Sequence, residues 1–254
     1  MWQILILLYF IFGTSFYLFR RVLAQQVAKY NQLINAIFFV GFLLPAGIIL
    51  ILLFPHNFHV GTANIFLLLI GSLIYPVAYV IAFKANQTVD VGTFTIISNL
   101  TPLITIAVAF SFLHEHLTLI QVMGAGLIVI SGIVVAHSGW KGSGTANPRG
   151  ILTCLLYAGL LGIAIAYERW MLTRVDFGAY IAYGWGAQIL WGVFLARKDI
   201  KNIGNLFRIS PHTTKLVIGM GASGALRSIS FIYALKISSA SVISSASNFL
   251  SVAV

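Results

Sequence analysis

The chain has 254 residues, of which 59% are hydrophobic and 8% are charged, and its mean hydropathy is +0.98. A soluble domain carries about 25% charged residues, so this composition excludes a soluble globule and indicates an integral membrane protein in contact with a lipid bilayer. The formal net charge of +10 does not indicate a nucleic-acid partner, because the Lys and Arg residues occur singly or in pairs between apolar stretches.

Apolar stretches of roughly the length needed to cross a bilayer core follow one another along the chain. They cover residues 2–19, 31–54, 61–83, 91–113, 117–137, 150–168, 178–196, 214–235 and 239–254. The stretches are continuous and lack the alternation of barrel strands, so they predict α-helices. We therefore expect an all-α membrane protein, a polytopic helical bundle with nine spans.

The clearest helix–turn–helix pattern runs from Ser98 to Val135. Two apolar arms flank the polar turn His114-Glu115-His116, and Thr118 with Gln121 has capping-box spacing at the start of the return helix. Pro102 lies one turn inside the outgoing helix, where neighbouring polar side chains can satisfy the freed carbonyl. The pattern predicts a chain that crosses the membrane and returns at once.

Small residues predict where helices pack closely. Gly124-Ala125 and Ser131-Gly132 are seven residues apart, so the two pairs share one face of the return helix. We expect Gly124 and Gly132, together with Gly13 and Gly162, to serve close packing or gate movement.

The sequence contains the pattern of an internal repeat. A shift of 149 residues superimposes the apolar stretches within a few residues and pairs Gly13 with Gly162, Arg20 with Arg169, and Ser98-Asn99 with Ser247-Asn248. An odd number of spans in each unit inverts the second unit, as in many secondary transporters whose site lies near the bilayer midplane.

The repeat predicts two domains. The first is a five-helix repeat over residues 1–137, and the second covers 149–254 and is truncated in its fourth helix. A tenth span is then expected beyond Val254; a natural nine-span protein is the alternative.

The whole chain resembles EamA-type proteins of the drug/metabolite transporter superfamily, most strongly over residues 98–132, and the second unit matches through Ala234-Leu235 to Val254. The run Phe12-Gly13-Thr14-Ser15-Phe16 followed by Arg20 resembles the first helix of that family, although Phe12 stands where a tryptophan is common. The fourth and fifth helices of the family are matched by Ser98-Asn99-Leu100-Thr101-Pro102, Glu115, Leu117-Thr118, Gln121, Gly124 and Gly132. The resemblance implies ten helices in two inverted five-helix repeats and solute transport without ATP hydrolysis. It implies no particular substrate.

Two charged residues are unusual for apolar stretches. Arg227 lies between Gly224 and Phe231, where a charge requires a partner or a wet cavity. It can meet an anionic group of a substrate or a neighbouring carboxylate, and a structural ion pair or snorkelling is an equally open alternative. Glu168 lies at the inner end of a stretch, and we hypothesise that it couples proton movement to transport. An ion pair with a neighbouring arginine, Arg169 or Arg20, is the more common role of such a residue.

We expect a substrate cavity lined by Arg20, Ser98, Asn99, Glu168, Arg227 and Asn248. Helix-to-helix hydrogen bonding is the more common role of an asparagine in a span. Tyr9, Tyr75, Tyr79 and Trp185 could line a cavity for organic solutes, although aromatic residues in spans more often pack or anchor at the interface.

The predicted function is a multi-pass permease of the cell membrane that moves a small organic solute by alternating access, without a cofactor or a catalytic residue. A homodimer stays an open alternative. The positive-inside rule favours an outside N-terminus and the family resemblance an inside one, so orientation is left open. The turn His114-Glu115-His116 does not predict a metal site, because adjacent turn residues seldom converge on one ion.

The sequence also bears on two other functional classes. The run Gly221-Ala222-Ser223-Gly224 matches the Gly-x-Ser-Gly of rhomboid-type intramembrane serine proteases, but their chemistry requires a histidine on a later helix and no histidine follows residue 212. A non-transporting scaffold is supported by no sequence feature.

Overall fold

The computed structural model describes residues 2–53, 57–113, 123–124, 126–127, 130 and 148–247. Within these residues the regular structure is helical, and seven segments are long and apolar enough to cross a bilayer. They are Gln3–Gln26, Ala28–Leu53, Thr62–Thr88, Gly92–Leu113, Pro148–Leu172, Phe177–Ala196 and Pro211–Ile237. These segments confirm the helical membrane class and correspond to the first four and the sixth to eighth predicted stretches. The fifth stretch, with the turn before it, and the end of the ninth lie largely or wholly outside the described residues.

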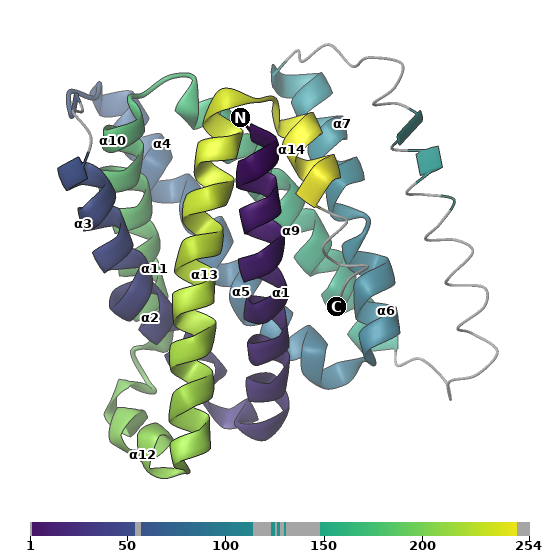
Figure 1. The fold of residues 1–254 in the computed structure, drawn as a ribbon, viewed down its shortest axis with the longest axis vertical. Coiled ribbons are helices and arrows are strands. Elements are labelled where there is room, and N and C mark those ends of the chain that lie inside the picture. Colours follow the sequence, from purple (N-terminus) through teal and green to yellow (C-terminus); the bar gives the residue numbers. More distant parts are fainter. Residues whose placement is uncertain are drawn as a thin grey trace.

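The elements follow one another with short connections (Figure 1). Up to Leu113 they are α1 (Trp2–Gln26), η1 (Ala28–Tyr30), α2 (Asn31–Phe38), η2 (Phe39–Leu43), α3 (Leu44–Leu53), α4 (Thr62–Gly71), α5 (Ile74–Thr88), α6 (Val91–Ser98) and α7 (Thr101–Leu113). From Pro148 they are α9 (Pro148–Leu172), α10 (Phe177–Ala179), η3 (Tyr180–Trp185), α11 (Gly186–Ala196), η4 (Ile200–Asn202), α12 (Ile203–Arg208), α13 (Pro211–Ile237) and α14 (Ala240–Ser247).

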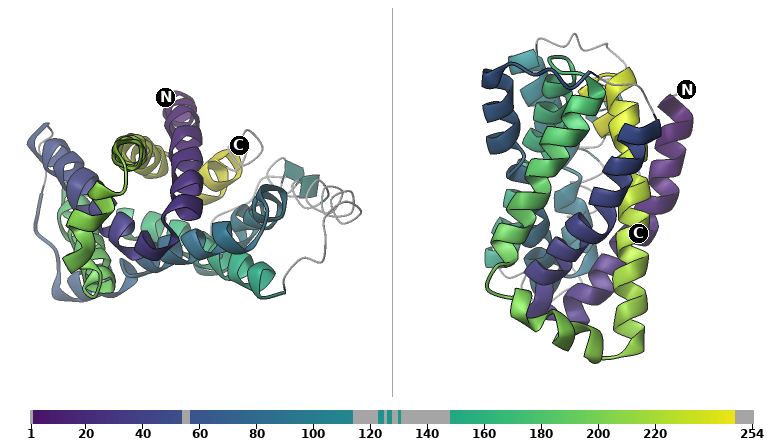
Figure 2. Two further views of the ribbon diagram at one scale, coloured as in Figure 1. Left: turned by 90° about the horizontal axis from the view of Figure 1, so that it is seen from below. Right: turned by 90° about the vertical axis from the view of Figure 1, so that its left-hand side faces the viewer.

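The helices α1 and α13 form the most extensive pair among the described elements, and α5 with α9 forms the next. In Figure 1, α1 descends from the N-terminus, whereas α13 rises from α12 at the bottom of the view, so the two run antiparallel. Seen from below, α1, α13 and α14 lie together on one side of the bundle (Figure 2). The cavity described below lies between this group and the helices behind it.

Helices α1 and α9 both extend past the charged residue at which their predicted apolar stretch ended. The stretch 2–19 ended before Arg20, but α1 continues to Gln26 and buries Arg20 to 1% exposure. The stretch 150–168 ended at Glu168, but α9 continues to Leu172. A charged side chain lowers local hydropathy without breaking the backbone hydrogen bonds of a helix, so hydropathy alone placed these ends too early.

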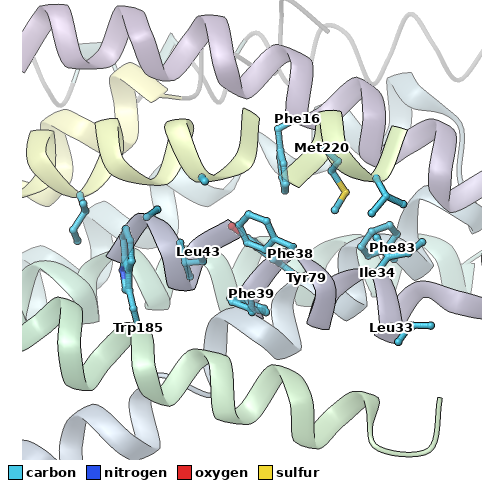
Figure 3. Close-up of a cluster of buried hydrophobic side chains, with 14 of the residues drawn as sticks. Phe16, Leu33, Ile34, Phe38, Phe39, Leu43, Tyr79, Phe83, Trp185 and Met220 are labelled. Carbon is cyan, nitrogen blue, oxygen red and sulfur yellow. The ribbon is translucent and has the colours of Figure 1, made fainter. Parts of the chain in front are cut away.

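The largest buried cluster gathers aromatic side chains at the centre of the bundle. Phe38 and Phe39 lie beside Tyr79, with ring centres 5.8 and 5.9 Å from that of Tyr79, and Phe16 packs on Phe38 from α1 (Figure 3). Phe39 and Leu43 belong to η2, a π-helical turn. A second π-helical turn, η3, occurs in the span that follows α9. A π-turn shifts the register of the side chains that follow it, and such turns are frequent at functional sites.

The span Thr62–Thr88 is broken between α4 and α5. Pro76 has no N–H to donate to the carbonyl four residues before it, which weakens the helix at this point. Side chains from other helices bond carbonyls on either side of the break: Tyr167 donates to Leu67 O at 2.6 Å and Trp191 to Leu69 O at 2.7 Å, while Asn35 donates to Pro76 O at 3.2 Å. The neighbouring spans therefore hold the interrupted helix in place.

Close packing at Gly162 agrees with the role expected of it. A Cβ added there would lie 2.8 Å from Ile104 Cβ and 2.9 Å from the carbonyl oxygen of Thr101, so α9 and α7 touch through this glycine. Gly13 is buried, whereas a Cβ on Gly124 would meet no described atom within 4 Å. Gly132 lies outside the described residues.

We predict that Gly162→Ala lowers the free energy of unfolding by about 1–3 kcal/mol, because α7 must move away to make room. The matched control is Gly159→Ala on the same helix, where an added Cβ meets nothing within 4 Å. That substitution should be neutral or stabilise by about 0.5–1 kcal/mol through helix propensity. Thermal denaturation of both variants in nanodiscs makes the comparison, and equal melting temperatures would show that the α7–α9 contact is looser than described.

Candidate functional site

A cavity of about 110 Å³ lies at the centre of the described bundle. Each of the seven candidate spans contributes at least one side chain to its wall. Among the residues expected from the sequence, the cavity brings together Arg20, Ser98, Glu168 and Arg227, and Pro102 also lines it. Asn99 does not line it, and Asn248 lies outside the described residues.

Arg227 is 7% exposed and sits within a group of tyrosines. Its guanidinium donates to the hydroxyl of Tyr9 at 3.2 Å and to those of Tyr17 and Tyr79 at 3.4 Å. The guanidinium carbon also lies 5.0 Å from the ring centre of Tyr9, 5.0 Å from that of Phe16 and 5.1 Å from that of Tyr17. The side chain therefore faces the interior of the bundle, and cation–π contacts stabilise its charge.

Arg20 is the more deeply buried of the two arginines, at 1% exposure. None of its three guanidinium nitrogens has a hydrogen-bond partner among the described residues. Its guanidinium carbon lies over aromatic rings, 4.6 Å from the ring centre of Tyr17, 5.4 Å from that of Phe16 and 5.8 Å from that of Tyr157. Ring contacts support the charge but satisfy none of its five N–H donors.

Both guanidinium groups face the same Tyr17 ring, at 4.6 and 5.1 Å from its centre. Their separation is therefore no more than about 10 Å, and at an effective dielectric constant of about 20 they repel each other by at least about 1.7 kcal/mol. Two buried like charges at this range require a compensating negative charge or ready access to water.

Glu168 is the acidic residue among the described residues that line the cavity, and other groups hold it. Tyr75 donates to Oε2 at 2.5 Å and Tyr180 donates to Oε1 at 2.8 Å. The carboxylate forms no ion pair within the described residues. The expected alternative, an ion pair with Arg169 or Arg20, is therefore not formed. Arg169 instead donates to the carbonyl oxygens of Leu235 and Lys236, both at 2.9 Å.

The remaining polar groups of the wall are mostly hydroxyls and amides. The buried side-chain oxygens of Ser98 and Thr101 have no hydrogen-bond partner in the described part of the chain. Asn86 and Gln188 also line the cavity, and Asn86 donates to Ala82 O at 2.8 Å. The four aromatic residues considered from the sequence, Tyr9, Tyr75, Tyr79 and Trp185, all line it.

Tyr17, Tyr157 and Tyr180 were not among the site residues expected from the sequence. The spacing of Tyr9, Phe16 and Arg20 places them on one face of α1. This periodicity could have indicated the neighbouring Tyr17 from the sequence. Tyr180 carries no local signal that pairs it with Glu168, since its position depends on the π-helical turn η3.

The serine of the protease-like motif is engaged in its own helix. Ser223 donates to Gly219 O at 2.6 Å and to Met220 O at 3.2 Å, which is the usual back-bonding of a serine inside a helix. A Cβ on Gly221 would collide with the Phe42 ring, and one on Gly224 would lie 2.7 Å from Phe16 and Phe38. The motif therefore packs α13 closely against α1 and the second span.

His114 and His116 lie outside the described residues, and no cluster of metal-ligating side chains occurs among the residues that the structure does describe.

The comparisons with known proteins agree with this architecture. No curated protein is significantly similar to the chain in sequence. The sequence pattern of the EamA-like transporter family, however, matches residues 1–137, which is more than half of the chain and includes the cavity residues of the first four spans. The chain therefore belongs to the EamA-like transporter family.

Proposed function

We propose that the chain is a cell-membrane permease that binds a small organic solute in the central cavity and moves it by alternating access between two inverted halves. The observation that carries this proposal is the cavity itself, which every candidate span of the described chain helps to line and which holds three buried charged side chains. Charges inside a membrane bundle are costly and commonly mark a substrate or ion pathway.

The proposed repeat is supported by the bounds of the helices. The shift of 149 residues carries the span Thr62–Thr88 onto Pro211–Ile237 and α6 (Val91–Ser98) onto α14 (Ala240–Ser247). In Figure 1 the first of these spans runs downward from α4 to α5, whereas α13 runs upward. Corresponding spans of opposite direction are what an inverted repeat requires.

The helix caps add a second, independent correspondence. Asp90 Oδ1 accepts from Thr93 N at 3.0 Å at the start of α6, and Ser239 Oγ accepts from Val242 N at 3.3 Å at the start of α14. The shift pairs Asp90 with Ser239 and Thr93 with Val242. Bonds from Thr93 also hold the pKa of the Asp90 carboxyl below its usual range. A side-chain cap at corresponding positions of α6 and α14 supports the proposed repeat.

Family membership supports transport over the two alternatives. Members of this family are generally not enzymes, and the hydroxyl of Ser223 is bonded to its own helix. Nothing in the described residues favours a non-transporting scaffold.

The proposed coupling residue is Glu168, which lies in the cavity wall with Tyr75 and Tyr180 as donors. Tyr75 lies just after the break between α4 and α5. A proton on Glu168 changes the hydrogen bond that joins α9 to this interrupted span, so protonation can bias the position of α5.

The cavity is tested by filling it. Leu161 lines the cavity at 8% exposure, whereas Leu156 on the same helix is 52% exposed on the outer surface. We expect Leu161→Trp to reduce the initial rate of saturable, ATP-independent uptake into proteoliposomes by about tenfold or more, because the indole occupies the solute site. The Leu156→Trp control should transport at the wild-type rate. Wild-type uptake by a folded Leu161→Trp variant would place the solute path elsewhere.

The coupling role is tested by Glu168→Gln. The amide keeps the size of the carboxyl but carries no titratable proton, so imposed proton gradients should no longer change the uptake rate. Asp90→Asn, at an exposed helix cap, is the control and should keep the gradient response. If the Glu168→Gln variant kept the full response, proton coupling would have to reside in another group.

A further inference from the structure

We infer that the solute is an organic oxyanion, in which a carboxylate or phosphate group binds between Arg20 and Arg227 and an apolar body lies against the aromatic wall. This inference rests on the proposed function and specifies the chemical class of its substrate.

The charges in the cavity are not balanced. Arg20, Arg21 and Arg227 line it, and Glu168 is the acidic residue among the described lining residues. Glu168 accepts hydrogen bonds from two tyrosines and forms no ion pair with either buried arginine. The cavity thus has an excess of positive charge that the described side chains leave unneutralised.

The two buried arginines carry hydrogen-bond donors that no described acceptor satisfies. All three side-chain nitrogens of Arg20 and the Nε of Arg227 are buried without a partner among the described residues. Arginine has donors and no acceptor, so the oxygens of Tyr9, Tyr17 and Tyr79 accept from Arg227 and their hydroxyl hydrogens point elsewhere. A ligand that complements these groups must be rich in acceptors, and a charged oxyanion forms the strongest such bonds.

The same arginines argue against a cationic solute. A group of aromatic rings around a cavity would by itself suit a cation. Here the guanidinium of Arg227 already occupies that position, about 5 Å from the rings of Tyr9, Phe16 and Tyr17. A cationic solute would meet two like charges.

The apolar part of the cavity wall indicates the chemistry of the rest of the solute. Trp185, Phe39 and Leu43 line the cavity, so its wall is apolar away from the arginines. Such a wall is complementary to an aromatic or aliphatic body and does not replace the hydration shell of a bare inorganic ion.

Three probes of equal shape test the charge: benzoate, benzamide and benzamidine, which are anionic, neutral and cationic at neutral pH. We expect benzoate to raise the melting temperature of the purified protein in nanodiscs in a saturable way, with benzamide and benzamidine at least tenfold weaker. Phenyl phosphate is the second oxyanion, and inorganic phosphate separates recognition of the charged group alone from recognition of the whole solute.

The variant is Arg20→Gln. Because Arg20 forms no hydrogen bond with a described residue, the change removes an unsatisfied buried charge, and the variant should fold. Its affinity for the oxyanion should fall by about tenfold or more. Arg174→Gln removes a cation that is exposed and stacked 4.1 Å from the Trp170 ring, and it should leave binding unchanged.

Several results would overturn the inference. One is that benzamide or benzamidine binds as tightly as the oxyanions. Another is that neither benzoate nor phenyl phosphate binds, and a third is that the Arg20→Gln variant keeps wild-type affinity. Saturable uptake of neutral or cationic solutes without competition by oxyanions would reject the inference and leave the permease standing. Oxyanion binding that requires Arg20, in a protein that transports none of the bound solutes, would support the site and reject the permease.

Discussion

The structure depends on how two arginine charges are kept inside a membrane bundle. Arg20 and Arg227 are both less than 10% exposed, and both lie against the rings of Phe16 and Tyr17 on α1. Aromatic faces offer a cation a favourable quadrupole without contributing a charge of their own. If acidic side chains replaced these rings, they would neutralise the arginines permanently. The aromatic rings instead stabilise the two charges and leave their electrostatic field directed into the cavity.

The same tyrosine chemistry keeps Glu168 apart from them. Tyr75 and Tyr180 come from two different spans and donate to separate oxygens of the carboxylate. A carboxylate that accepts two such bonds is stabilised without a cation, so a buried negative charge and two buried positive charges coexist in one cavity without collapsing into an ion pair. The cavity therefore holds its two buried arginines and its carboxyl group as separate groups.

The sequence was sufficient to predict the helical membrane class, the family and four of the charged or polar residues in the cavity wall. It succeeded because a charge such as Arg227 in an apolar stretch has few acceptable positions other than the bundle interior. Hydropathy failed at Arg20, because a charged residue near the end of an apolar stretch is as compatible with the interface as with the core. The partners of Glu168 could not be predicted, since Tyr180 faces the carboxylate from within a π-helical turn and pairwise geometry between spans is not encoded in local pattern.

The proposed repeat and the site differ in one instructive way. Under the shift of 149 residues, Arg227 corresponds to Ala78 and Glu168 to Phe19, while Arg20 corresponds to Arg169, which bonds backbone carbonyls at the end of α13. The charged side chains of the cavity therefore do not follow the proposed repeat. Under the proposed function, a repeated scaffold would supply two related conformations of similar free energy, and an unrepeated set of charges would supply a single solute site that both conformations share. If an anion binds beside Arg227 and a proton binds Glu168, which accepts from Tyr75 and Tyr180, the opposite charges of the two ligands favour each other's binding. Binding of the two would then be cooperative.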